Sequence, residues 1–88
     1  MNKFYFFSKQ DCVPCALVHK YLNSIKIDTS IVEKIDLMEN LDLAEKYGIF
    51  TTPVLLVIKG DDEDCVIEEH VGGLNITQNI KRLIETYA

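Results

Sequence analysis

The chain has 88 residues, of which 48% are hydrophobic and 26% charged, and its formal net charge is −5. This length leaves room for one domain, residues 1–88, and the composition is typical of a globular protein and excludes a disordered one. The nine Lys and Arg residues are scattered along an acidic chain, so we expect no surface for nucleic acid.

The N-terminal segment MNKFYFFSKQD contains an apolar run that ends too soon for a signal peptide, and no small-residue cleavage site follows it. We therefore expect a cytoplasmic protein with no membrane partner. Three cysteines cannot all pair within one chain, and cytosolic thiols are kept reduced. These cysteines therefore indicate a reactive or metal-binding role in place of a disulfide scaffold.

The first half of the chain predicts two strands and two helices. Residues 3–7, KFYFF, form a continuous apolar run, which is typical of a central strand covered on both faces. The β-branched segment 29–36 predicts a second strand, and residues 40–48 predict a short helix that ends on a glycine. Residues 12–27 predict a helix because apolar side chains recur there at helical spacing, namely Val18, Tyr21, Leu22 and Ile25.

The second half predicts a hairpin and a helix. Residues 53–73 contain two strand-like runs joined by an acidic turn at 60–64, which is the pattern of an antiparallel hairpin. Asn75 is expected to cap a last helix, whose apolar face is Ile76, Ile80, Leu83, Ile84 and Tyr87. The order is βαβαββα. Because the opening βαβ unit is parallel, we predict a compact α/β fold with a four-stranded mixed sheet flanked by three helices.

A Cys-x-x-Cys pair lies where the first strand gives way to the first helix. Cys12 falls at the helix N-terminus, where unpaired N–H groups and the helix dipole stabilise a thiolate, so it is the candidate nucleophile. Cys15, one turn later, is placed to resolve the mixed disulfide that forms on Cys12. Pro14 suits the first helical turn. Lys9 favours the thiolate and Asp11 opposes it, so we treat both as modulators.

Other cysteines and histidines weigh little against this interpretation. A structural zinc site takes four ligands, and beyond the pair the chain offers only Cys65, His19 and His70, in no paired arrangement. We therefore predict no metal ligand. Cys65 is expected to be a small core residue, His19 has no evident partner, and His70 is expected on a surface strand.

Three motifs in order carry a family resemblance: the Cys-x-x-Cys after the first strand, TTP before the third, and VGG before the last helix. Over nearly the whole chain they resemble the thioredoxin and glutaredoxin superfamily, in particular its short thioredoxin-like and glutaredoxin-like redoxins. The resemblance implies a thioredoxin-like fold and disulfide oxidoreductase activity. It implies that Pro53 is cis and that Thr52 binds an extended substrate segment. It also implies that Gly72 and Gly73 let a partner backbone approach. Two simpler explanations stay open: Pro53 as a proline that opens a strand, and the two glycines as a turn before the last helix.

The subfamily stays open on sequence. The entry FSKQDC is similar to that of glutaredoxins and favours glutathione, whereas Pro14 and the segment YGIFTTPVLLVIKGDD resemble thioredoxin. Residues 74–77 lack the acidic side chains with which glutaredoxins contact glutathione. The aromatic residues 4–7 stand where thioredoxins keep a buried aspartate, which leaves the group that assists proton transfer to Cys15 unassigned.

The leading hypothesis is a small thiol–disulfide oxidoreductase that reduces disulfide-containing proteins. We expect a monomer with no bound cofactor, which receives electrons from NADPH through a flavin-dependent, thioredoxin-reductase-like partner, or from glutathione. The alternatives are a glutathione-dependent glutaredoxin, a redoxin of the kind that serves ribonucleotide reductase, and a non-catalytic metal or iron–sulfur binding module. Pro14 and the incomplete glutathione site speak against the last of these.

Overall fold

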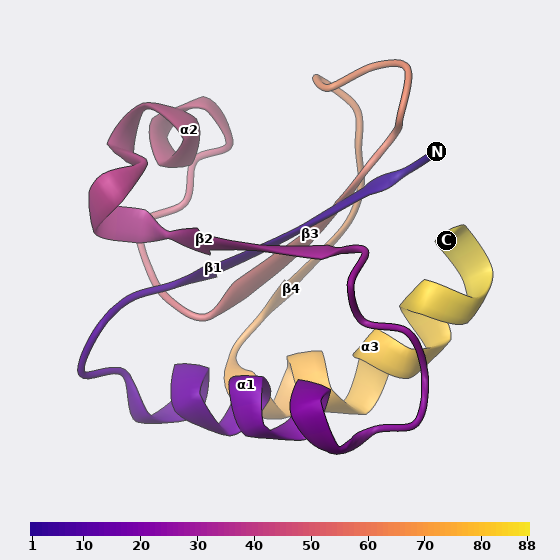
Figure 1. Ribbon diagram of the computed structural model, residues 1–88. Coiled ribbons are helices and arrows are strands. Elements are labelled where there is room, and N and C mark those ends of the chain that lie inside the picture. Colours follow the sequence, from indigo (N-terminus) through magenta and orange to yellow (C-terminus); the bar gives the residue numbers. More distant parts are fainter.

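The four strands and three helices follow the predicted order, with one short 3-10 helix in addition. The computed structural model describes all 88 residues (Figure 1). No helix is long and apolar enough to cross a membrane. In chain order the elements are β1 (Lys3–Ser8), α1 (Val13–Ser24), β2 (Val32–Asp36), η1 (Leu37–Glu39), α2 (Leu41–Lys46), β3 (Val54–Ile58), β4 (Val66–Val71) and α3 (Gly73–Tyr87).

The strands form one mixed sheet in the order β2-β1-β3-β4. Strand β1 pairs in parallel with β2 and antiparallel with β3, and β4 pairs antiparallel with β3. Every residue of β3 is buried, because helices cover both faces of the sheet at its centre. The prediction of a four-stranded mixed sheet flanked by three helices is confirmed.

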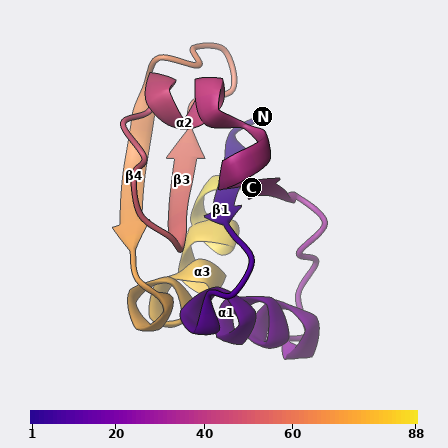
Figure 2. The ribbon, with the colours of Figure 1, turned by 90° about the vertical axis from the view of Figure 1, so that its left-hand side faces the viewer.

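Helices α1 and α3 cover one face of the sheet, and α2 with η1 covers the other (Figure 2). Successive side chains of a strand point to opposite faces, so β1 contributes side chains to the apolar cores on both faces of the sheet. Phe4 and Phe6 pack with the buried residues of α1 and α3, whereas Phe7 packs with those on the α2 side. Burial of each ring contributes roughly 1.5–3 kcal/mol, so β1 anchors the segment that leads into the Cys-x-x-Cys pair.

The connection between α1 and β2 takes more residues than the sequence predicts. Helix α1 ends at Ser24 and β2 begins only at Val32. Between them, the Asp28 carboxylate accepts the backbone N–H of Ser30 at 2.9 Å and its hydroxyl at 2.6 Å. This turn, closed by side-chain to backbone bonding, uses residues that otherwise favour a strand.

Helix α2 ends at Lys46, and Gly48, the glycine predicted to stop it, follows two residues later at a positive φ of 67°. The backbone N–H of Gly48 donates to the carbonyl of Glu45 at 3.1 Å, and that of Ile49 donates to the carbonyl of Ala44 at 2.8 Å. These bonds satisfy carbonyls left free at the end of the helix. The chain is thereby turned toward residues 50–53, which lead into β3.

The start of α3 differs from the prediction. The helix begins at Gly73 with Gly72 in the N-cap position, so Asn75 lies inside the first turn and is not the cap. The φ of +94° at Gly72 turns the chain out of β4 at once, so the cap lies three residues earlier than expected. The Asn75 side chain instead ties the helix to β4, because its Nδ2 donates to the carbonyl of Val71 at 3.3 Å and its Oδ1 lies 3.2 Å from Nδ1 of His70.

Candidate active site

Cys12 occupies the N-cap of α1. Its backbone is extended, with φ −111° and ψ 103°, and its Sγ accepts the backbone N–H of Cys15 at 3.2 Å. The first turn of α1 contains Pro14 and no acidic residue. A negative charge on this sulfur would therefore meet both a donor and the positive end of the helix dipole. Cys12 therefore lies at the helix N-terminus, where the sequence places it.

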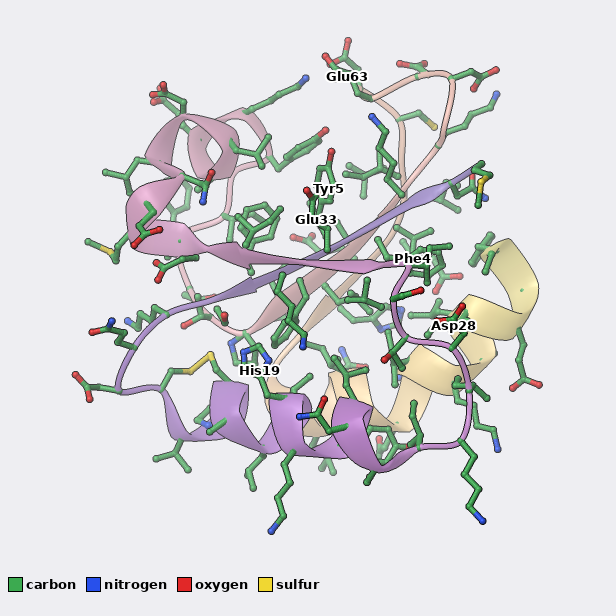
Figure 3. The ribbon with its side chains drawn as sticks, viewed as in Figure 1. Phe4, Tyr5, His19, Asp28, Glu33 and Glu63 are labelled. Carbon is green, nitrogen blue, oxygen red and sulfur yellow. A yellow bond between two sulfur atoms is a disulfide. The ribbon has the colours of Figure 1, made fainter.

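Cys12 and Cys15 form a disulfide in the structure, with their Cα atoms 5.2 Å apart (Figure 3). The two residues differ in access. Cys12 is half-buried and reaches the surface, whereas Cys15 is only 2% exposed. Only the sulfur of Cys12 is therefore accessible to a large partner.

The start of β3 faces Cys12. The hydroxyl of Thr52 donates to Sγ of Cys12 at 3.5 Å, and the Thr52–Pro53 peptide bond is cis. Pro53 is buried, and its carbonyl accepts the backbone N–H of Gly72 at 3.0 Å. The backbone N–H and carbonyl of Thr52 have no hydrogen-bond partner within the chain. The contact brings Thr52 next to Cys12 from 40 residues away along the chain. The free N–H and the free carbonyl of Thr52 therefore lie beside the disulfide.

The paired glycines close the other side. A Cβ on Gly73 would lie 3.1 Å from Cβ of Pro14 and 3.2 Å from its carbonyl oxygen, so a side chain there would crowd the first turn of α1. A Cβ on Gly72 would meet nothing within 4 Å, and this residue is held at a positive φ. The structure therefore brings Thr52, Pro53, Gly72 and Gly73 together around the Cys12–Cys15 pair.

The two charged residues predicted as modulators line a hollow beside the pair. This hollow, of about 460 Å³, is lined by Lys9, Asp11, Cys12, Val13, Cys15, Ala16 and His19. Lys9 and Asp11 are both exposed. Local pattern gives His19 no evident partner, but its position four residues after Cys15 is a signal for this placement, because residues at that spacing share a helix face.

Large apolar side chains flank these residues in the sequence and point into solvent. Val13, Phe50 and Leu74 are 72%, 82% and 72% exposed. Val13 follows Cys12, Phe50 precedes the Thr-Thr-Pro segment, and Leu74 follows Gly73. Single exposed apolar side chains are common on protein surfaces, so the sequence positions of these three, next to site residues, are what make them candidate contacts for a protein partner.

Cys65 lies apart from the pair, just before β4, and is a free thiol. It is half-buried and belongs to neither apolar core, so the expectation of a core residue is wrong. The reason is local: its backbone closes the acidic turn, with its N–H donating to the carbonyl of Asp62 and its carbonyl accepting from Lys59, both at 3.0 Å. No three His, Cys, Asp or Glu side chains converge to form a set that could hold a metal ion.

A disulfide at the start of a helix, with one accessible and one buried sulfur, on a mixed sheet of this topology defines the thiol–disulfide oxidoreductases. Comparison with known proteins agrees. The chain is 30% identical over 77 residues to a thioredoxin of Chlorobaculum thiosulfatiphilum, with 84% of this chain and 68% of the relative covered. A thioredoxin of Bacillus subtilis is 36% identical over 64 residues, with 69% and 59% covered. The chain belongs to the thioredoxin family.

Solved structures show the same fold. A mutant thioredoxin from Halobacterium salinarum is 30% identical with a TM-score of 0.76, and covers 98% of this chain with 74% of its own. A reduced Schistosoma mansoni thioredoxin, 22% identical, has a TM-score of 0.77 and covers 99% of this chain with 79% of its own. No family model matches the sequence. The protein is a protein thiol–disulfide oxidoreductase, a class that binds no cofactor of its own and works between disulfide-containing proteins and a reductase.

Proposed function

We propose that Cys12 is the nucleophile and Cys15 the resolving thiol of a monomeric, single-domain reductase of protein disulfides that spans residues 1–88. One observation carries this assignment: the N-cap sulfur of Cys12 reaches the surface and accepts the Cys15 N–H, whereas Cys15 is 2% exposed. A disulfide within a protein can approach only an accessible sulfur. The order of the two steps follows from this difference in access.

The first step joins Cys12 to the substrate, and the second releases it. The Cys12 thiolate attacks one sulfur of the substrate disulfide and forms a mixed disulfide. Cys15 then attacks Sγ of Cys12, which expels the substrate as a thiol and leaves the Cys12–Cys15 disulfide. That disulfide is the state present in the structure.

Thr52, Pro53, Gly72 and Gly73 bind the substrate beside Cys12 in this proposal. The unpaired N–H and carbonyl of Thr52 are the groups that an extended peptide segment uses when it pairs with a strand edge. The absence of side chains at Gly72 and Gly73 leaves room for that segment. Lys9, Asp11 and Pro14 adjust the reactivity of the thiolate without touching the substrate.

The electrons come from NADPH through a flavin-dependent thioredoxin reductase, in the cytoplasm. Membership of the thioredoxin family supports this donor, as does the absence of acidic side chains at residues 74–77 beside the paired glycines. One observation favours glutathione as a second candidate donor. Lys9 lines the same hollow as Cys12, where its ammonium could pair with a glutathione carboxylate.

Recycling assays test the donor. Oxidised protein is mixed with insulin as the disulfide substrate and with NADPH plus thioredoxin reductase, glutathione plus glutathione reductase, or dithiothreitol. We expect turnover with thioredoxin reductase and dithiothreitol and little with glutathione. Cys12→Ser should abolish turnover in every arm, whereas Cys65→Ser, the matched cysteine control, should retain it. Turnover with glutathione alone would reject the proposed donor, and full activity of Cys12→Ser would reject the mechanism.

A further inference from the structure

The second step of exchange requires that the Cys15 thiol lose its proton, because the thiolate is the attacking form. Its surroundings provide no buried acceptor. No polar or charged side chain is buried anywhere in the chain, so no carboxylate lies beneath Cys15. On β1, the strand that leads to the pair, Phe6 is fully buried. An acceptor must therefore come from the side that is open to solvent.

His19 lies on that side. It follows Cys15 by four residues on α1, so the two side chains share a helix face. Its imidazole packs edge-on against Phe6, with ring centroids 5.1 Å apart and planes at 83°. Figure 3 shows the ring rising from α1 toward the sheet, on the side of the helix that carries the disulfide. His19 and both cysteines line the same hollow, and neither ring nitrogen has a hydrogen-bond partner within the chain.

The groups around His19 keep its imidazole neutral at neutral pH. Partial burial lowers the pKa of His19 below its usual value, and the positive charge of Lys34 on β2 lowers it further. Lys34 pairs in register with Phe6, the residue on which the imidazole packs. From the loop before α1, Lys9 and Asp11 face the same hollow with opposite charges. A neutral imidazole has one unprotonated nitrogen, which can accept a proton.

We propose that His19 accepts the proton of the Cys15 thiol, across the hollow that both residues line, in the second step of disulfide exchange. The proposal rests on the roles of Cys12 and Cys15 given above. The proton moves from Sγ of Cys15 to the imidazole, and the Cys15 thiolate attacks Sγ of Cys12. The Cys12–Cys15 bond forms while the bond between Cys12 and the substrate breaks. The electron pair leaves on the substrate sulfur, which takes the proton back from the imidazolium.

The test separates the two steps in time. Reduced protein in a Cys65→Ser background is mixed in a stopped-flow instrument with a nitrobenzoate disulfide, whose released thiolate is coloured and needs no proton. The first phase of colour reports attack by Cys12, and the second reports attack by Cys15. His19→Gln should slow the second phase by about tenfold at pH 7. This loss is smaller than is usual on removal of a general base, because solvent also reaches the hollow and can accept the proton. The rate of the first phase should stay within about twofold of that of the parent. In Lys20→Gln, an exposed control on the same helix, the rates of both phases should stay within about twofold of the parent.

The pH profile separates proton transfer from a structural effect. The second phase of the parent protein should fall on acidification, with a midpoint equal to that of the His19 imidazole titration measured by NMR, and this limb should be absent in His19→Gln. Free imidazole should restore the second phase of His19→Ala. If His19→Gln fails to fold, the parent profile still decides: a midpoint that does not coincide with His19 overturns the proposal.

Two further results would overturn it. The second phase of His19→Gln could match the parent at every pH, or both phases could slow equally, which would indicate only a disturbed helix. A failure of the proposed function itself would give different results from these. A parent protein with a single phase, or a Cys12→Ser variant that retains the first phase, would reject the roles of the cysteines and the inference with them.

Discussion

The hydroxyl of Thr52 donates a hydrogen bond to Sγ of Cys12 at 3.5 Å, so the segment before β3 is directly coupled to the sulfur at the start of α1. Thr52→Val removes this donor and keeps the shape of the side chain. Because a donor stabilises the thiolate more than the thiol, we expect alkylation of Cys12 by iodoacetamide at pH 7 to slow by about threefold. The neighbouring Thr51 is exposed and makes no such contact, so Thr51→Val should react at the parent rate. Equal rates for the two variants would show that the hydroxyl has no effect.

Gly73→Ala tests the close approach between the paired glycines and α1. The new Cβ would lie 3.1 Å from Cβ of Pro14, which is held by the helix backbone and cannot move away freely. We expect a loss of about 1–2 kcal/mol in the free energy of unfolding, measured with urea. Leu74→Ala, at a neighbouring residue that is 72% exposed, should change it by less than about 0.5 kcal/mol. A Gly73→Ala variant as stable as the parent would contradict the contact.

Glu68 tests how α3 is held to the sheet. Its carboxylate accepts hydrogen bonds from the guanidinium of Arg82 at 3.1 Å and from the hydroxyl of Tyr87 at 2.6 Å, and Nε2 of His70 lies 2.9 Å away. These contacts lower the pKa of Glu68 from 4.5 to about 2, and the hydrogen bond from Arg82 has the largest effect. A carboxylate whose pKa is lowered in the folded state stabilises the fold above its unfolded pKa and loses this effect as the pH falls through the folded pKa.

Glu68→Gln should therefore cost about 1.5–3 kcal/mol of unfolding free energy at pH 7. The difference from the parent should shrink as the pH falls from 4.5 toward about 2, where the parent carboxylate is itself protonated. Urea unfolding at several pH values measures this. Glu69→Gln changes the next residue of β4, which is exposed, and should have no such dependence. A difference for Glu68→Gln that is constant with pH would contradict the ionic role of Glu68.

Phe50 tests whether exposed apolar side chains near the pair bind protein substrates. Its ring is 82% exposed, and covering a ring of this size contributes roughly 1–2 kcal/mol, so Phe50→Ser should raise KM for insulin by about tenfold. The rate with a small aromatic disulfide should not change, because that substrate is too small to cover the ring. Val66→Ser is the control, because Val66 is an exposed residue at the start of β4, the end of that strand that lies away from Gly72. An unchanged KM for Phe50→Ser would exclude this side chain from the interface.

The sequence predicts the elements and the positions of the two cysteines because both depend on local patterns. Apolar periodicity marks α1 and α3, and the strand-to-helix switch places Cys12 at an N-terminus whichever way the rest of the chain folds. The start of α3 differs from the prediction for a local reason too. Both Gly72 and Asn75 can start a helix, and only the backbone angle at Gly72 decides between them.

The contacts that complete the site could not be predicted from local patterns. The bond between Thr52 and Cys12 joins residues 40 apart, and the approach of Gly73 to Pro14 depends on how α3 packs beside α1. The contact of the His19 ring with Phe6, a residue of β1, likewise depends on how α1 packs on the sheet. These features belong to the packing of elements, which one sequence specifies only through the whole fold.

Trapping the mixed disulfide tests most directly whether Cys12 is the nucleophile and Cys15 the resolving thiol. Cys15→Ser retains two thiols, Cys12 and Cys65, and cannot complete the second step. After reaction with a disulfide-bonded protein such as insulin, peptide mapping by mass spectrometry shows which cysteine carries the adduct. We expect a stable adduct on Cys12 and none on Cys65. An adduct on Cys65, or no adduct from a folded Cys15→Ser protein, would contradict these roles.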